Sequence, residues 1–565
     1  MAAGIAVLVA LGAAETAHAQ SQPLPPEAAR QLEIERRQQQ QIEAQRARAQ
    51  QRPDVLTPEA APDAPSGLRL PAEDPCFSID RVNWEALVPP SALRRVAEAV
   101  QGQCVGIEGL QQLQKYLGER LIDDGYITTR VLMPEQTLAE GTLTLRYVPG
   151  TIGAVRDEGT PGWWRTVLPA GSGSAVNQRD LDQALENIRR LAGQADASID
   201  LLPGAHLGES DIQIKPGTGK RWHAYVGADN AGMDTTGKNQ LNAGLTLDSP
   251  LFLYDQLSAS WNSNADMGNS QAGARAASIN YSVPVGYWSF FAGASRSHYR
   301  QTVAGFEAPI VFGGTSKQIE AGVAVVPYRG ASYKGTASFK MLRKRANSTL
   351  NDIDIEVQRR DVVGYEFAYG HRHYVGRAAI DIGGGVRGVL PKLSNNVGYV
   401  FGDPDWNGRT LILSGNAGLY LPFTVGGQQM AYQGVWKIQH VKTPLVPADY
   451  FTIGNRYAVR GFDGQMTLAA EDGWSLRNDV SLNLDGAGLA GQQLYTGLDI
   501  GRVSGPSSDY LASRTLAGAV AGLRGRIPMP YVTASYDLSA GWPLKKPEVL
   551  KTQSMVVAAT LMFQF

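Results

Sequence analysis

The final nine residues of the chain alternate between apolar side chains and smaller or more polar ones, and they end on a phenylalanine. A stripe with a period of two residues is typical of a strand that has one face against apolar surroundings. An aromatic end is typical of the last strand of an outer-membrane β-barrel, because the outward face of that strand meets lipid. The apolar positions are Val557, Ala559, Leu561, Phe563 and Phe565.

The same character extends far back along the chain, which a single edge strand of a soluble sheet would not explain. From Gly219 onward, alternating segments such as Leu241–Leu247 are separated by turn residues, with polar partners that would face a wet lumen. The sequence therefore predicts a mainly β fold with a C-terminal transmembrane antiparallel β-barrel over residues 217–565. Phe563 and Phe565 are its expected C-terminal barrel signal.

Length, composition and charge restrict the class of membrane protein and the kind of partner that the sequence allows. The 565-residue chain has a formal net charge of −1, and 43% of its residues are apolar. Its length predicts several domains. Outside the extreme N-terminus no run of about 18 apolar residues occurs, which excludes a membrane protein built from helices. The balanced charge gives no reason to expect a nucleic-acid partner.

Residues 1–19 have the features of a secretory signal peptide. They contain a short apolar run, and Ala17-His18-Ala19 ends in the small-x-small pattern of a cleavage site, so we expect processing before Gln20. No lysine or arginine precedes Arg30, which is consistent with a start codon further upstream. A short buried helix is the alternative interpretation.

A polar segment and a linker follow. Residues 26–51 are rich in Gln, Arg, Glu and Ala, and their few apolar residues cannot form a core-facing stripe. A helix that is polar on all sides is surrounded by water or is unfolded. Residues 20–51 are therefore either a solvated helix or coil, or a plug helix in a water-filled pore. Residues 52–73, rich in Pro, Ala and Asp, predict a flexible linker.

The sequence pattern of residues 74–150 predicts a small α+β domain with the element order strand, helix, helix, strand, strand. Ser91 is expected to cap the first helix. The only two cysteines, Cys76 and Cys104, connect the first strand with the loop between the helices. In an exported protein such a lone pair is most simply a structural disulfide. The expected elements are strands over 77–82, 127–133 and 143–148 and helices over 92–100 and 106–124.

Residues 151–216 repeat this plan in a second small domain. A strand over 152–156 is followed by a long helix over 177–192 and by two further strands. The last two strands are expected over 197–202 and 211–214. Neither repeat contains a catalytic constellation, which is consistent with a scaffolding role.

These two domains carry a family resemblance. The segments GYITTRVLMPEQTLAEGTLTLRYVPGTI (125–152), RDLDQALENIRRL (179–191) and GESDIQI (208–214) resemble the paired POTRA domains of two-partner secretion transporters, the TpsB (ShlB/FhaC/HecB) family. The resemblance extends over residues 74–565, and its motifs occur in the family's order. It implies a barrel of sixteen strands in the outer membrane, with the POTRA domains in the periplasm.

The resemblance also identifies a candidate functional site. Within FTIGNRYAVRGFDG (451–464), one tetrapeptide matches the family's VRG(F/Y) tip, on a long extracellular loop that folds back into the barrel. A guanidinium in a narrowed lumen needs a carboxylate partner. Asp499 matches the family's acidic partner, and Asp479 is a weaker candidate. Taken alone, the arginine of the tip would be an ordinary exposed loop residue. The tip consists of Val459, Arg460, Gly461 and Phe462, in which the glycine permits the tight turn.

Other motifs are better explained without a cofactor. Residues 232–239 nearly match a nucleotide-binding P-loop, but Asn239 lacks the metal-binding hydroxyl and a strand-like pattern follows where a helix is needed. His371 and His373 share one strand face, which a wet barrel wall explains better than zinc, since no third ligand is evident. No Gly-x-Ser-x-Gly elbow occurs. We therefore expect neither a metal nor a cofactor.

The resulting prediction is a transporter, not an enzyme. It would recognise one large unfolded exoprotein of the TpsA type through its POTRA domains and translocate it through its barrel to the cell surface. Its other expected partners are outer-membrane lipid and the barrel-assembly machinery. The main alternative is an outer-membrane insertase similar to BamA, which typically has more POTRA repeats. A passive porin would not explain the two repeats, and an enzyme would need a nucleophile or an acid–base pair.

Overall fold

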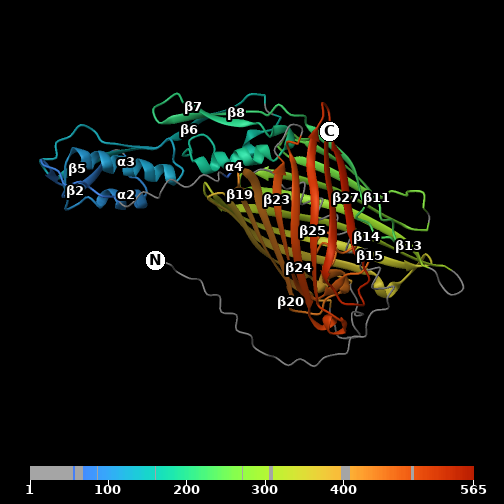
Figure 1. Ribbon diagram of the computed structural model, residues 1–565. Helices are drawn as coiled ribbons and strands as arrows, with labels where there is room; N and C mark the ends of the chain where they lie inside the picture. The colour runs from blue at the N-terminus through green and yellow to red at the C-terminus, as the bar shows by residue number, and fades with distance from the viewer. Residues whose placement is uncertain are drawn as a thin grey trace.

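Two small α+β domains lie beside one end of a β-barrel (Figure 1). The computed structural model describes residues 55–56, 68–85, 87–159, 161–269, 271–303, 309–395, 408–484 and 489–565. The predicted signal segment 1–19, the polar segment 20–51 and most of the linker 52–73 lie outside these residues.

The first domain packs two helices against a small sheet. Strand β5 is central, with β2 parallel on one side and β4 antiparallel on the other. Leu113, Leu117 and Leu121 of α3 recur at the four-residue spacing of one helix face, and all three are buried in the domain core. The elements are β1 (Phe77–Ser78), β2 (Arg81–Glu85), α2 (Ser91–Glu98), β3 (Cys104–Val105), α3 (Ile107–Asp123), β4 (Arg130–Leu132) and β5 (Thr142–Val148).

The predicted helix cap at Ser91 is wrong. Helix α2 begins at Ser91 itself, Pro90 occupies the N-cap position, and no side chain makes a capping hydrogen bond. Because Ser91 already has helical backbone, its hydroxyl is not placed to accept from the N–H groups of the first turn.

The end of the predicted linker is also different from expectation. Leu68 and Leu70 pack against the core of the first domain. Glu73 accepts hydrogen bonds of 2.7–3.1 Å from three backbone N–H groups at the N-terminus of α3. A carboxylate at this place satisfies free helical N–H groups and interacts favourably with the helix dipole. Residues 68–73 therefore belong to the first domain and are not a flexible connection.

The second domain repeats the plan. Strand β8 is central, parallel to β6 and antiparallel to β7, which lies at an edge. Asn177 is the N-cap of α4, because its side chain accepts a hydrogen bond of 2.8 Å from the N–H of Arg179. The elements are β6 (Thr151–Asp157), η1 (Trp164–Thr166), α4 (Gln178–Arg189), η2 (Ala192–Gln194), β7 (Ser198–Pro203) and β8 (Glu209–Lys215).

Among the described residues, sixteen antiparallel strands form one closed barrel, in which β27 pairs with β9. This confirms the predicted fold class. The strands are β9 (Trp222–Asp229), β10 (Gln240–Asp248), β11 (Gln256–Asn264), β12 (Gly273–Val285), β13 (Trp288–Val303), β14 (Ile310–Arg329), β15 (Tyr333–Leu350), β17 (Arg360–Val375), β18 (Ala378–Val389), β19 (Leu411–Val425), β20 (Gln428–Val441), β23 (Asp472–Leu484), β24 (Gln492–Ser504), β25 (Thr515–Pro528), β26 (Thr533–Lys545) and β27 (Val556–Gln564). Short elements in the connections are β16 (Ile353–Asp354), η3 (Glu356–Gln358), η4 (Pro391–Leu393) and η6 (Pro506–Tyr510).

Successive residues of each strand face the lumen and the outside in turn. In β11, Ser258 and Ser260 line the lumen, whereas Trp261 is exposed on the outer face. In the final strand, Val557 and Leu561 are 53% and 43% exposed, as the apolar stripe predicted. This alternation lets a wall of modest mean hydropathy present apolar residues to lipid and polar residues to water.

No helix in the described part of the chain is both long and apolar enough to cross a membrane.

The second domain is docked on the rim at which the chain enters the barrel. Tyr254, in the turn between β10 and β11, is fully buried in the core of that domain. The Asn187 side chain donates a hydrogen bond of 2.8 Å to the carbonyl oxygen of Gly286, in the next turn of the same rim. Arg329, at the end of β14, donates to the side-chain oxygen of Gln183 at 2.7 Å. Shared core and buried hydrogen bonds therefore fix the domain on the barrel.

The predicted position of the two histidines is wrong. Arg372, between them in β17, lines the lumen and pairs with Asp381 at 2.7 Å. His371 and His373 therefore point outward, where their rings contact the tyrosine rings of neighbouring strands. Single-sequence alternation shows that the two histidines share a face but not which face it is.

The two cysteines are bonded in the structure and join β1 to β3, with their Cα atoms 5.4 Å apart. The bond closes a sequence separation of 28 residues, for which loop-closure entropy predicts a contribution of about 3–4 kcal/mol. We expect the Cys76→Ser/Cys104→Ser variant to unfold its first domain at lower denaturant concentration, measured by hydrogen exchange of the α3 amides. Thiol labelling supplies the control, since denatured, unreduced wild-type protein should take up no label. Labelling at both cysteines would contradict the bond.

Candidate functional site

The long connection between β20 and β23, residues 442–471, turns back into the barrel. Arg456 and Tyr457 of this loop line the same cavity as the inward residues of the wall. The predicted tip, residues 459–462, follows directly and lies inside the barrel. The loop contains η5 (Pro447–Asp449) and a small hairpin of β21 (Phe451–Ile453) and β22 (Leu468–Ala470).

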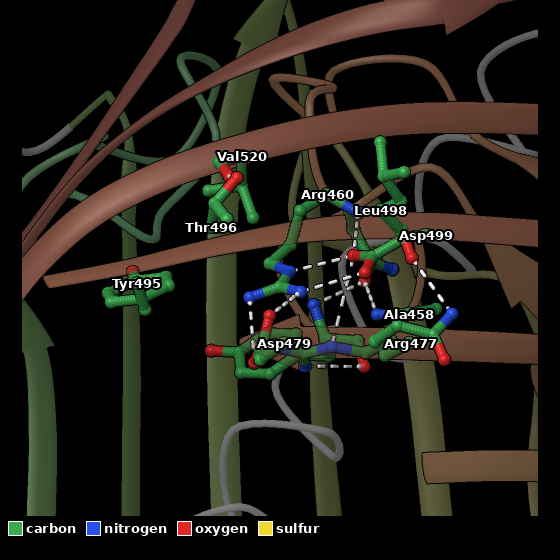
Figure 2. Close-up of polar contacts among 12 residues, drawn as sticks. Ala458, Arg460, Arg477, Asp479, Tyr495, Thr496, Leu498, Asp499 and Val520 are labelled. Carbon is green, nitrogen blue, oxygen red and sulfur yellow. Dashed lines mark hydrogen bonds and ion pairs between the residues drawn. The ribbon is translucent and has the colours of Figure 1, made fainter. Parts of the chain in front are cut away.

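Arg460 at this tip makes its main contact with Asp499 on β24 (Figure 2). Its Nε donates to Oδ2 at 2.7 Å and its Nη2 donates to Oδ1 at 2.7 Å, which is a planar bidentate pair. The backbone N–H of Arg460 also donates to Oδ2 of Asp499, at 2.9 Å. One carboxylate therefore holds both the side chain and the backbone of the tip. The structure brings together the two residues that the sequence analysis paired.

Two more charged residues complete the site (Figure 2). Asp479 on β23 accepts hydrogen bonds from Nη1 and Nη2 of Arg460, the first at 3.3 Å. Arg477, two residues earlier on the same strand, has its Nε 3.9 Å from Oδ2 of Asp499 and donates to the carbonyl oxygen of Tyr457 at 3.4 Å. The weaker candidate Asp479 is thus a direct partner of Arg460. Arg477 was missed, although its two-residue spacing from Asp479 places both on one strand face.

The four charged groups balance one another in a largely dry place. The side chains of Arg460, Asp479 and Asp499 are 11%, 12% and 0% exposed. Removing such charges from water is costly, and their mutual attraction offsets that cost only when every group is paired. Two guanidinium groups face two carboxylates here, so loss of any one group leaves a net charge inside the wall. We name these residues, Arg460, Arg477, Asp479 and Asp499, the charge cluster.

Strand glycines let the loop tip lie directly against the wall. A Cβ on Gly518 of β25 would overlap the carbonyl oxygen of Arg460, and one on Gly541 of β26 would lie 2.9 Å from the Cα of Gly461. Gly461 itself has φ +96°, a conformation that other residues rarely adopt, and its own Cβ would lie 2.5 Å from the carbonyl oxygen of Trp542. Any larger side chain at these glycines would push the tip away from the wall. The sequence analysis identified only Gly461 among them.

Apolar packing holds the loop on both sides of the arginine. Val459 is fully buried and Phe462 is 3% exposed. Both belong to one apolar cluster with residues of the loop, of the barrel wall and of the connection between β26 and β27, namely Ile453, Ala458, Leu468, Ala470, Val503, Leu516 and Leu550. At the tip, Val459 and Phe462 are therefore held by apolar contacts, and Arg460 between them is held by ion pairs.

The remaining lumen is a cavity of about 1960 Å³ with a polar lining. Its charged side chains are mostly paired across strands, as for Lys340 with Glu366 at 3.2 Å and Arg387 with Asp449 of the loop at 3.2 Å. The charged groups around the tip are likewise paired with one another. The arrangement is suited to positioning a loop in a water-filled passage.

A closed barrel with a charge-locked loop in its lumen, and two small domains in series of which the second is docked on one rim, define an outer-membrane transporter whose POTRA domains lie in the periplasm. Comparison with known families agrees. The family of the haemolysin secretion/activation proteins ShlB/FhaC/HecB matches residues 208–525, the ShlB-type POTRA domain matches residues 77–150, and a second POTRA family matches residues 151–203. The chain belongs to the ShlB/FhaC/HecB family.

Individual relatives are similar over almost the whole chain. The outer membrane transporter CdiB-2 of Burkholderia pseudomallei (strain 1026b) is 33% identical over 97% of both chains. The hemolysin transporter protein ShlB of Serratia marcescens is 27% identical over 90% of this chain and 88% of its own. The solved structure of CdiB from Escherichia coli superposes with a TM-score of 0.83 at 26% identity and covers 96% of this chain and 99% of that one. Family membership therefore favours the transporter over the insertase that the sequence left open.

The charge cluster predicts strong coupling between Arg460 and Asp499. Arg460→Ala leaves two carboxylates facing one guanidinium, and Asp499→Ala leaves the reverse, so each should destabilise the barrel by up to about 3 kcal/mol. The double variant keeps the balanced pair Arg477 and Asp479, so its loss should fall short of the sum of the single losses by at least about 1 kcal/mol. Thermal unfolding followed by tryptophan fluorescence measures this cycle.

An exposed ion pair in the same barrel supplies the control. Arg514 and Asp509, in the connection between β24 and β25, pair with side chains 40% and 61% exposed. Their cycle should show a coupling of no more than about 0.5 kcal/mol, because water screens the pair. Equal coupling in the two cycles would show that the charge cluster is not an interdependent unit.

Proposed function

We propose that this transporter exports one large exoprotein of the TpsA type, which its POTRA domains capture unfolded in the periplasm and its barrel conducts to the cell surface. The observation that carries the proposal is the loop held by charge inside a closed barrel with a polar lumen, together with a POTRA domain docked at its rim. No bond chemistry is needed for this task, and the named relatives are transporters. Folding of the substrate outside the cell supplies the driving force.

Within this proposal, Arg460 and Asp499 act as one functional unit that keeps the loop tip at its place in the passage. The single variants described above should each reduce the secreted amount of exoprotein while the barrel still assembles. Outer-membrane lipid surrounds the apolar wall, and the barrel-assembly machinery recognises the final strand with Phe563 and Phe565.

Capture is assigned to the edge strand β7 of the second domain. A groove of about 500 Å³ runs between β7 and α4 and is lined by Leu181, Leu185, Ile199 and Leu202 together with polar residues. An extended segment can add to such an edge through its backbone, while the groove takes alternate side chains. This matches an unfolded substrate, which has free backbone groups and exposed apolar residues.

Leu202→Lys should weaken binding of the exoprotein's N-terminal region to the full-length transporter by about tenfold, because it places a charge in the apolar part of the groove. Leu207→Lys is the matched control, since Leu207 is 97% exposed and lies outside the groove. Surface plasmon resonance with the exoprotein encoded beside the transporter gene measures both. Equal affinities of the two variants would place capture elsewhere.

Residues 20–51 are proposed to occupy the lumen at rest and to leave it during transport. The lumen is lined mostly by polar residues, which suits a helix that is polar on every side. Deleting residues 20–51 should raise the planar-bilayer conductance well above that of the full protein. The control is a variant that keeps a segment of the same length and composition at positions 20–51 but in scrambled order. Unchanged conductance after the deletion would rule out the plug.

A further inference from the structure

A dense group of positive side chains lies on the outer face of the barrel, at the end away from the POTRA domains. These residues project from four neighbouring strands, β12 to β15, and none belongs to the charge cluster or to the lumen. They are Arg275, Arg296, Arg300, Lys317, Arg343 and Arg345.

Strand alternation establishes that these side chains face outward. In β13, Ser295 and Ser297 line the lumen, so Arg296 between them points to the outside. In β14, Ser316 and Gln318 line the lumen, so Lys317 also points outward. Arg345 of β15 follows the same rule, and its side chain is 58% exposed.

Three of these cations are direct cross-strand neighbours. Arg296 is the register partner of Lys317, and Lys317 is the register partner of Arg345. We name these three residues the basic row. Like charges directly opposite each other destabilise a sheet. The row is therefore unfavourable unless negative charge lies over it.

The acidic groups among the described residues supply only part of that negative charge. Asp361 binds Arg345 at 2.9 Å but also binds Arg343 at 2.7 Å, and Asp352 binds Arg300. Within the part of the chain that the structure describes, Arg296 and Lys317 have neither an ion-pair partner nor a hydrogen-bond partner for their side chains. Two adjacent cations are thus left without a counter-ion among the described residues.

The row lies at the outer border of the apolar band. On the periplasmic side of it, the outward face carries Phe290, Ile319, Phe339 and Met341, which are 41–60% exposed. Trp288 begins β13 at the periplasmic rim and Arg296 lies eight residues further. Eight residues span about 27 Å along a strand, or about 20 Å of height after tilt, close to the apolar height of such barrels.

We infer that the basic row binds the phosphate groups of lipopolysaccharide in the outer leaflet. Guanidinium groups bind phosphate through two parallel hydrogen bonds, and lysine adds a point charge. The lipid's acyl chains then lie along the exposed apolar residues directly below. The unpaired cations, their repulsion and their height beside the apolar band all point to an anionic headgroup on an anchored lipid.

The test compares the full protein with Arg296→Gln/Lys317→Gln in detergent, with purified lipopolysaccharide as the probe. The wild type should bind it about tenfold more tightly than the double variant, since two charge-assisted contacts are lost. Without lipid, the double variant should be at least as heat-stable as the wild type, because it relieves repulsion. Native mass spectrometry and thermal shift measure the two quantities.

Arg502→Gln is the matched control. Arg502 is also outward-facing near the same end of the barrel, but its register partners are Trp474 and Thr515 and not cations. This variant should bind lipopolysaccharide like the wild type. Dephosphorylated lipopolysaccharide should lose the tight binding, and phosphatidylglycerol or inorganic phosphate should not replace it.

Equal binding by the wild type and the double variant would overturn the inference. Equal stabilisation by phosphatidylglycerol would also overturn it, because it would show attraction to any anionic surface. If the double variant fails to assemble, the comparison of phosphorylated with dephosphorylated lipopolysaccharide on the wild type decides. None of these outcomes depends on secretion.

Discussion

A buried guanidinium determines how this barrel is filled. Arg460 lies where little water reaches it, so the cost of burying its charge is offset by the two carboxylates that accept its hydrogen bonds. Those carboxylates come from two adjacent strands of the wall, and the backbone of the tip is held by the same oxygen that binds the side chain. Other features follow from this contact. The wall needs glycines where the tip touches it, and the loop needs apolar anchors on either side.

The docked second POTRA domain gives the passage a fixed entrance. Tyr254 of the barrel completes the core of that domain, and Arg329, whose side chain is 1% exposed, joins β14 to α4 through Gln183. A buried cation cannot exchange this partner for water at low cost. Helix α4, which forms one wall of the groove beside β7, is therefore held in one orientation to the barrel mouth. A segment bound in that groove would start its passage from a defined place.

Much of this architecture could be predicted from the residues, and the reasons for the failures are physical. Period-two alternation and an aromatic end predicted the barrel, since lipid on one face and water on the other leave few options. The family motif paired Arg460 with Asp499. Arg477 was missed because the need for a second cation arises only when Asp479 and Asp499 are seen to share one guanidinium. Glu73 was assigned to a linker because its binding to the start of α3 is a long-range contact that composition does not reveal.

The histidine error shows what a strand pattern leaves open. The sequence His371-Arg372-His373 places the two histidines on one face of the strand and the arginine on the other. It does not show which of these faces lies inside the barrel. The lumen position of Arg372 is decided by Asp381, which lies on the next strand and is reached only through the register of β17 and β18.

Charged residues on the two faces of the wall have different surroundings. In the lumen, several cations have acidic partners within the protein, as Lys340 has Glu366 and Arg387 has Asp449. On the outer face, Arg296 and Lys317 are adjacent and have no such partner among the described residues. At that height the surroundings are not water alone, since apolar side chains begin two residues below, at Ile319. The basic row at the lipid border therefore depends on its surroundings for a counter-ion.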